Sequence, residues 1–143
     1  MSYDKILVPY DGSPFAKRAF DRALDIAEAK NSKITALYVI KEEYPPIVGF
    51  SKAYAKIMKA RQKEAKTLMA KLESVAKKRK IQVISKIKRG DSIVKEITDF
   101  LKSNKFDLVI IGSHGRTGFK KLMLGSVSSG VVNNSKNPVM VVK

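Results

Sequence analysis

The residues of this chain best suited to do chemistry lie in a glycine-rich turn that follows a short apolar run. The run covers residues 108–111, and the turn continues over 112–126 with glycines at positions 112, 115, 118 and 125. Glycine tolerates positive φ and lets a ligand approach the main chain, so successive N–H groups can form an anion-binding concavity beside a helix start. The turn therefore predicts a site for a phosphate group.

Composition excludes several other kinds of site. The 143 residues include no cysteine and one histidine, which excludes disulfides and thiolate sites and disfavours a transition-metal site made only of protein ligands. No run of about 18 apolar residues is present, and Asp4 and Lys5 precede any long hydrophobic region, so we expect neither a membrane span nor a signal peptide. We expect a soluble, cytoplasmic protein with one domain over residues 1–143, because 44% hydrophobic residues suffice for a single core.

Apolar patterns predict strands and helices that alternate along the chain. Ser13 is expected to cap the first helix with Pro14 at its first position, and Asn31 to end it. The other expected helices cover about 51–79, 93–101 and 126–135, and the expected strands cover 5–9, 34–40, 81–87, 106–111 and 138–142. This alternation predicts an α/β fold, a Rossmann-like doubly wound sheet of five parallel strands with helices on both faces.

The expected sheet brings two turn-rich loops together. In such sheets a ligand sits outside the carboxyl ends of the strands, at the point where the strand order reverses. For the order 3-2-1-4-5, the first and fourth strands flank that point. The loops that follow them are residues 9–13 and the glycine-rich turn. Both loops are therefore expected to border one crevice.

Short motifs in these two loops resemble those of a known family. The dinucleotide fingerprint and the Gly-Lys-Ser/Thr end of a Walker loop are both absent. The chain instead has Gly-x-x-Gly, nine residues and Gly-Ser, together with Val-Pro-Tyr-Asp-Gly-Ser at 8–13 and Asn-Pro-Val-Met-Val-Val at 137–142. Over essentially its whole length the chain resembles the universal stress protein family, specifically the nucleotide-binding branch. The resemblance implies an adenine nucleotide alpha hydrolase-like fold, ATP or AMP as the ligand, and a stress-response or regulatory role.

The resemblance also implies roles for single residues. Asp11 is expected to accept hydrogen bonds from the ribose hydroxyls, and the main chain of Val39 to meet the adenine edge. Pro9 and Tyr10 are expected to line the base pocket. The phosphates are expected on the glycine-rich turn and the helix that follows it. The complete set of expected contacts adds Ser13, Ile111, Gly112, Ser113, Gly115, Arg116, Gly125, Ser126, Val127 and Ser128, of which Ser113, Arg116 and Ser128 are expected as secondary contacts.

Each of these roles has a simpler structural alternative. Asp11 could form only an Asx-turn or help to cap the first helix, and Gly112 and Gly115 could serve only as turn formers. Arg116 could meet a phosphate or face water. His114 is expected to be a turn residue and not an acid–base catalyst, because no acid or nucleophile is evidently paired with it.

Positive charge is concentrated in one part of the chain. The formal net charge is +16, and residues 51–90 hold 14 Lys and Arg against only two acidic residues, a net +12. A row of lysines is expected opposite the apolar stripe of the long helix. Such a row is usually a solvated face, but it also suits an acidic partner or nucleic acid; any nucleic-acid contact would be electrostatic, because no aromatic residues are interleaved. The expected row is Lys52, Lys56, Lys59, Lys63 and Lys66, and the expected stripe is Tyr54, Ile57, Met58, Ala65, Leu68, Leu72 and Val75.

Three functions remain open at this point. The first is a regulatory module that binds ATP or AMP. The second is a slow ATP hydrolase in which Mg²⁺ or Mn²⁺, held through the nucleotide phosphates, acts with Ser126; no general base is evident, so the resemblance supports at most weak hydrolysis. The third is an anionic-surface or nucleic-acid binder that uses the basic second helix.

Two features near the C-terminus predict packing. The apolar strand Val139 to Val142 would leave an edge open to pairing, so we expect a homodimer through this strand. Gly130 is expected inside the last helix, where glycine costs about 1 kcal/mol relative to alanine. It is expected to mark either close packing or a bend.

Overall fold

The sheet has five parallel strands in the order β3-β2-β1-β4-β5, as the sequence predicted. A computed structural model describes residues 2–43, 51–116 and 124–143. The strands are β1 (Lys5–Pro9), β2 (Lys33–Lys41), β3 (Val83–Gly90), β4 (Leu108–Gly112) and β5 (Val139–Val142). The helices are α1 (Pro14–Lys30), α2 (Ser51–Lys78), α3 (Ile93–Ser103) and α4 (Ser126–Asn134).

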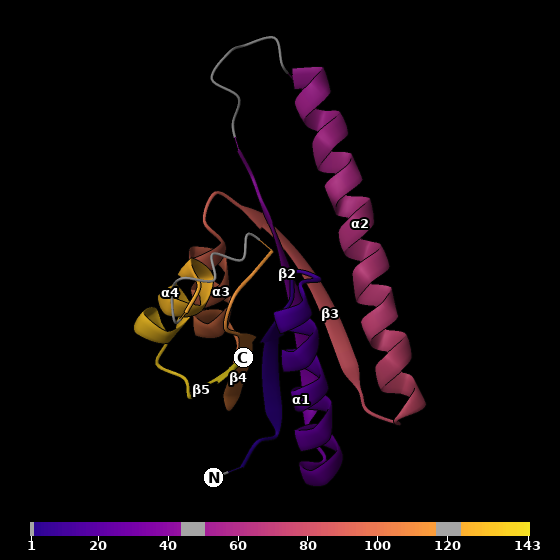
Figure 1. The fold of residues 1–143 in the computed structure, drawn as a ribbon, viewed down its shortest axis with the longest axis vertical. Helices are drawn as coiled ribbons and strands as arrows, with labels where there is room; N and C mark the ends of the chain where they lie inside the picture. Colours follow the sequence, from indigo (N-terminus) through magenta and orange to yellow (C-terminus); the bar gives the residue numbers. More distant parts are fainter. Residues whose placement is uncertain (1, 44–50, 117–123) are drawn as a thin grey trace.

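Helices cover both faces of the sheet, α1 and α2 on one face and α3 and α4 on the other (Figure 1). Alternate residues of the central strands supply the two cores. Ile6 and Val8 of β1 pack with α1 and α2, whereas Leu7, between them, packs with α3 and α4. This alternation follows from the two-residue period of a strand. It explains why β1 reads as a continuous apolar run, since both of its faces are buried.

The pairing of β1 with β4 is short, and this opens the sheet where the ligand was expected. Only Ile6 and Leu7 of β1 have partners on β4, namely Leu108 and Val109. The end of β1 turns instead toward β2, where the Tyr10 N–H donates to the carbonyl of residue 37 at 2.9 Å. The loops after β1 and β4 therefore leave the sheet on either side of the switch point.

The first helix begins and ends as predicted. The Ser13 hydroxyl accepts a hydrogen bond from the N–H of Ala16 at 3.1 Å, and Pro14 occupies the first turn. Asn31 ends the helix with φ of 56°. This left-handed conformation is one that asparagine adopts more readily than most residues. The cap at Ser13 fixes the direction in which α1 leaves the loop after β1.

Strand β3 differs from its predicted range of 81–87. It begins at Val83 because Lys80, at φ of 60°, first turns the chain after α2. It continues to Gly90 because β2 offers partners up to Lys41. Its range depends on a neighbouring strand, which local periodicity does not reveal. Strands β4 and β5 also begin one or two residues later than predicted, and the loop expected at Tyr44 to Pro46 lies outside the described residues.

The apolar stripe of α2 was predicted in part wrongly. Ile57 and Val75 are 51% and 45% exposed, whereas Met69 and Ala76, absent from the predicted stripe, are buried. Each exposed residue directly precedes a buried one, so it lies about 100° around the helix from the packed face. The lysines of the predicted row are exposed, as expected. Among the helices of the described ranges, none is both long and apolar enough to cross a membrane.

Gly130 marks close packing between α3 and α4. A Cβ atom built on Gly130 would lie 2.5 Å from Cγ2 of Val94, closer than real contacts allow. The helix α4 runs continuously through this position. The glycine therefore lets α4 approach the β-branched side chain of α3.

This contact predicts a reversal of a helix-propensity effect. In the native chain, Gly130→Ala should lower the free energy of unfolding by about 1–3 kcal/mol, because the stiff Val94 side chain cannot move aside cheaply. In a Val94→Ala background, where the nearest remaining atom is the Cβ at 3.3 Å, the same change should cost at least about 1 kcal/mol less than in the native chain. Urea unfolding of the four variants measures both effects. An equal effect in the two backgrounds would contradict the assigned contact.

Candidate functional site

A pocket opens at the carboxyl ends of β1, β2 and β4, at the switch point of the sheet. The empty space within it is about 490 Å³, with the open solvent at its mouth included. Nine of the residues predicted as ligand contacts line it: Pro9, Tyr10, Asp11, Val39, Ile111, Gly112, Gly115, Val127 and Ser128. Both loops thus border one crevice, as the sequence predicted.

Several lining residues were not predicted. Four are apolar residues of α1, β2 and α3 that give the pocket an apolar wall, and the fifth, His114, lies in the turn after β4. The sequence positions of the four apolar residues look like ordinary core positions, so no signal separated them from the core before the fold was known. The five residues are Ala16, Leu37, Ile93, Ile97 and His114.

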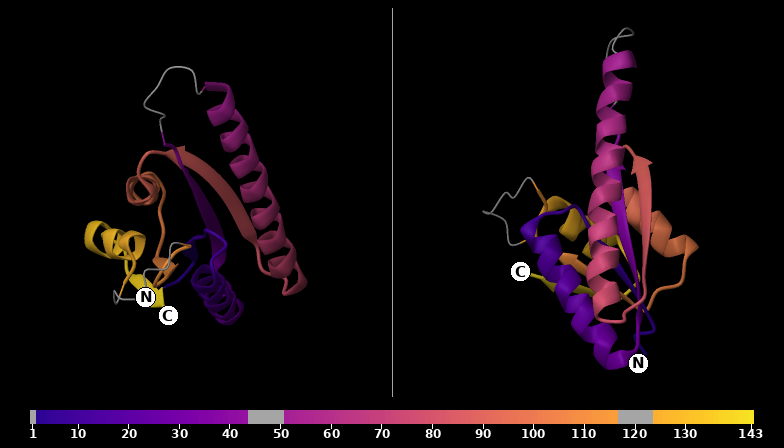
Figure 2. Two further views of the ribbon diagram at one scale, coloured as in Figure 1. Left: turned by 45° about the horizontal axis from the view of Figure 1, so that its top comes forward. Right: turned by 90° about the vertical axis from the view of Figure 1, so that its right-hand side faces the viewer.

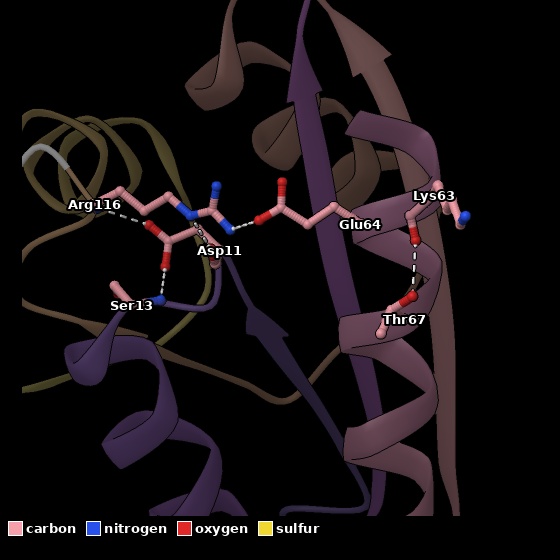
Figure 3. Close-up of polar contacts among 6 residues, drawn as sticks. All are labelled: Asp11, Ser13, Lys63, Glu64, Thr67 and Arg116. Atoms are coloured by element: carbon pink, nitrogen blue, oxygen red, sulfur yellow. Dashed lines mark hydrogen bonds and ion pairs between the residues drawn. The ribbon is translucent and has the colours of Figure 1, made fainter. Parts of the chain in front are cut away.

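Asp11 joins the two loops that border the pocket (Figure 3). One carboxylate oxygen, Oδ1, accepts the N–H of Ser13 at 2.9 Å, and the other, Oδ2, accepts the N–H of Arg116 at 3.1 Å. The first contact is the Asx-turn expected as the structural alternative. A carboxylate oxygen can accept more than one hydrogen bond, so both oxygens keep acceptor capacity. The structural role of Asp11 is therefore compatible with ligand binding.

Gly115 allows this carboxylate to lie against the second loop. A Cβ atom built on Gly115 would be 2.9 Å from Oδ2 of Asp11. That distance is too short for a side-chain carbon. The absence of a side chain at this position is what lets the backbone approach the carboxylate, a reason beyond simple turn formation.

Arg116 connects the glycine-rich turn to the long helix α2. Its Nε donates to the carbonyl oxygen of Asp11 at 2.6 Å, and its guanidinium also lies 2.6 Å from Oε1 of Glu64 (Figure 3). Burial opposes the charge of Arg116, but its hydrogen bond to the Glu64 carboxylate and the charges of Tyr38, Glu64 and Asp11 raise its pKa on balance. The side chain, 47% exposed, thus serves as a cationic tie between elements.

Tyr10 presents a neutral phenol to the pocket. Burial raises its pKa above the ordinary value, and the negative charges of Asp11 and Asp21 raise it further. The charged form is disfavoured both by the loss of water and by these carboxylates. Tyr10 therefore contributes an uncharged, largely apolar wall beside Asp11.

The start of α4 borders the same crevice. Gly125 caps this helix without a side-chain acceptor, and its own N–H donates to the carbonyl of Ser113 at 2.6 Å. The first N–H groups of a helix lack partners within the helix and carry its positive dipole end. Ser126, the first helical residue, is exposed. The middle of the glycine-rich turn, with Gly118, lies outside the described residues.

The other predicted serines are engaged within the protein. Ser13, Ser113 and Ser128 are all buried. Ser13 caps α1, the Ser113 hydroxyl lies 3.0 Å from Nδ1 of His114, and the Ser128 hydroxyl donates to the carbonyl of Gly112 at 2.5 Å. Ser13 and Ser113 do not line the pocket, nor do Arg116, Gly125 and Ser126. These five residues surround it instead.

Nearly the whole chain is similar to proteins of one known family. A model of the universal stress protein family matches residues 2–143. Universal stress protein MJ0531 of Methanocaldococcus jannaschii is 30% identical over 143 residues, which cover 99% of this chain and 82% of that protein. The structure of UspA from Lactobacillus plantarum superposes with a TM-score of 0.93 at 26% identity, covering 100% of this chain and 99% of the other.

A more distant structure extends the fold comparison. The universal stress protein from Archaeoglobus fulgidus in complex with dAMP has a TM-score of 0.67 and 18% identity, with complete coverage of both chains. At this identity the likeness concerns the fold alone.

The hydrogen bond of Ser128 predicts a structural role that can be separated from ligand binding. Ser128→Ala should lower the free energy of unfolding by about 1–3 kcal/mol, because the buried carbonyl of Gly112 loses its donor. Ser129→Ala, in the next position of α4, is the control, since the Ser129 side chain has no hydrogen bond to any described residue. Chemical unfolding followed by circular dichroism measures both. An equal effect of the two changes would show that the bond to Gly112 contributes nothing.

Proposed function

Because the chain belongs to the universal stress protein family, we propose that its switch-point pocket binds an adenine nucleotide, ATP or AMP, as the ligand of a regulatory, stress-response module. The observation that carries this proposal is the position of Asp11. Its carboxylate lies at the border between an apolar pocket and two backbone segments rich in N–H groups. A nucleoside phosphate has three parts in the matching order: an aromatic base for the apolar pocket, a hydroxylated sugar for the carboxylate, and an anion for the backbone N–H groups.

Each part of the nucleotide has a matching environment. The base would lie against the apolar wall of the pocket, which includes Val39 and Ile97. The main chain of Val39 would meet the polar edge of the base. The ribose hydroxyls would donate to Asp11, forming hydrogen bonds that are stronger because the acceptor is charged. The phosphates would reach the backbone at Gly115 and the start of α4, where Ser126 adds a hydroxyl.

The A. fulgidus structure supports this assignment, since a protein of similar fold was solved in complex with dAMP. A protein of this fold can therefore hold an adenine mononucleotide. The specific contacts proposed for the present chain rest on its own residues.

The geometry favours holding the nucleotide over hydrolysing it. Within the described part of the chain, no group of three His, Asp or Glu side chains could hold a metal ion, so Mg²⁺ or Mn²⁺ would be bound through the phosphate oxygens. The Nδ1 atom of His114 is already within hydrogen-bond distance of Ser113. The carboxylate of Asp11 is engaged by two N–H groups. These contacts hold the two loops that border the pocket.

The role of Asp11 predicts a non-additive loss of affinity. Asp11→Asn should weaken ATP binding about 10- to 100-fold, because a hydrogen bond to a charged group contributes about 1.5–3 kcal/mol. 2′,3′-Dideoxy-ATP, which lacks both ribose hydroxyls, should bind the native chain more weakly by a similar factor. Isothermal titration calorimetry should find that the variant no longer distinguishes the two nucleotides.

Asp4→Asn is the matched control, since Asp4 is an exposed carboxylate before the start of β1, at the other end of this strand from the pocket, and the change in charge is the same. It should leave both affinities within about threefold of native, as expected for a screened surface charge. Equal discrimination between the nucleotides by native chain and Asp11→Asn would refute the ribose contact. Failure of the native chain to bind ATP or AMP at millimolar concentration would refute the proposed function itself.

We also propose that two copies of the chain pair through β5, the last strand of the sheet order. On β5, Met140 is 37% exposed, while Val139, Val141 and Val142 are half-buried. An apolar edge strand invites pairing with another chain. A second β5 would cover this edge and extend the hydrogen-bonded sheet across both copies.

Light scattering should accordingly give a mass about twice 15.9 kDa at micromolar concentration. Met140→Lys should shift the protein to monomer, because an edge charge opposes strand pairing. Val132→Lys is the control, since Val132 is a similarly exposed valine on α4, away from the edge. A monomeric native chain, or dissociation by the control alone, would count against β5 as the interface.

A further inference from the structure

The long helix α2 stands at the side of the molecule, and its upper end extends beyond the sheet (Figures 1 and 2). Its C-terminal half packs on the sheet through Ala65, Met69, Leu72 and Ala76. Nearer the N-terminus the buried contact is Met58. The face turned away from the sheet is therefore free to meet another molecule along most of the helix.

This outer face carries an unbroken row of positive charge. The row, called here the lysine row, consists of Lys52, Lys56, Lys59, Lys63 and Lys66, all exposed. Its members alternate four and three residues apart, so they follow one side of the helix. At 1.5 Å per residue they span about 21 Å. No member forms an ion pair with any residue of the described chain.

Other charges of the same region are already used within the fold. Arg79 forms ion pairs with Asp25 and Glu28 of α1. Glu64, one of only two acidic residues in 51–90, is bound to Arg116, and the other, Glu73, hydrogen-bonds to a serine of β3. Both acidic residues of this region are thus engaged within the fold, and neither forms an ion pair with a member of the lysine row.

The side chains that lie between the lysines indicate the class of partner. Thr67, Ala70 and Ser74 lie on the same exposed side, and they are small. Protein partners usually bind through a central aromatic or large aliphatic anchor, and none of these three residues supplies one. Phosphate contacts, in contrast, come from lysine and from small hydroxyl side chains. The face therefore suits a phosphate backbone better than a protein surface.

The length and regular spacing of the lysine row indicate which kind of nucleic acid fits it. The helix α2 is continuous over 28 residues, so it presents its charges at a regular spacing. A nucleic-acid duplex is stiff and carries one negative charge per roughly 1.7 Å of its axis, so about 21 Å of it holds on the order of 12 phosphates. Without exposed aromatic rings along the row, the stacking that favours single strands is missing.

We propose that the lysine row of α2 is a docking surface for the phosphate backbone of a nucleic-acid duplex, bound without sequence preference. A hollow between α2 and β3 continues the surface, since Lys56, Lys59, Lys63 and Lys66 line it. Its other lining residues include Tyr54, Met58 and Arg89, and Arg89 is paired with Glu42. This surface lies outside the switch-point pocket and does not depend on its ligand.

The test is fluorescence anisotropy of a labelled 20-base-pair DNA of scrambled sequence, titrated with the full chain at several salt concentrations. About five phosphate contacts predict that the logarithm of the association constant falls with the logarithm of salt concentration with a slope of about −4 to −5. The triple variant Lys56→Glu, Lys59→Glu and Lys63→Glu should bind at least about tenfold more weakly at 50 mM salt and show a shallower slope.

The matched control is Lys102→Glu, Lys105→Glu and Lys136→Glu, which makes the same change in net charge at exposed lysines near the starts of β4 and β5. It should keep affinity within about threefold of native. Circular dichroism and ATP titration verify that both variants fold. No binding by the native chain at low salt, equal losses in the two triple variants, or tighter binding of a polyglutamate peptide or of single-stranded DNA would each overturn the proposal.

Discussion

The arrangement of the candidate site depends on one carboxylate, that of Asp11. Strands β1 and β4 pair over only two residues, so the backbone alone does not hold their loops together beyond the sheet. The carboxylate does so by accepting one N–H from each loop, those of Ser13 and Arg116. Its place requires a glycine at 115, where a side chain would collide with it. The crevice thus has a fixed width before any ligand enters.

The same tie extends to the long helix α2. Arg116 contacts both the backbone of Asp11 and the carboxylate of Glu64 on α2. With both side chains about half exposed, the ion pair contributes about 1 kcal/mol or less to stability, so its importance lies in position. It joins the border of the proposed nucleotide pocket to the helix that carries the lysine row. A ligand that drew Arg116 toward its phosphate would have to compete with Glu64.

Local signals sufficed for much of the fold. Ser13, Pro14 and Asn31 each act on residues next to them, so the limits of α1 could be predicted, and the alternation of strands and helices led to the strand order. The end of β3 could not be predicted, because it is set by pairing with β2. The exposure of Ile57 and Val75 depends on how α2 is rotated about its axis against the sheet. Periodicity alone predicts that rotation only to within about one residue.

The site shows the same division between local and distant information. Motif spacing led to Asp11 and the glycines, and topology then brought their loops together. Arg116 pairs with Glu64, a residue 52 positions earlier in the chain. The sequence around neither residue contains a signal that predicts this pairing. The apolar wall, including Ile97, was hidden among core positions because burial against a ligand and burial against protein require the same side chains.

The central claim, that the switch-point pocket holds an adenine nucleotide, is tested most directly by titrating ¹⁵N-labelled protein with ATP and following backbone amide signals by NMR. The account predicts saturable shifts at Asp11, Val39, Gly115 and Val127, the residues that line the pocket. Signals on the outer side of α2, such as that of Ala70, should move little. An unchanged spectrum at millimolar ATP, or shifts confined to residues away from the pocket, would contradict it.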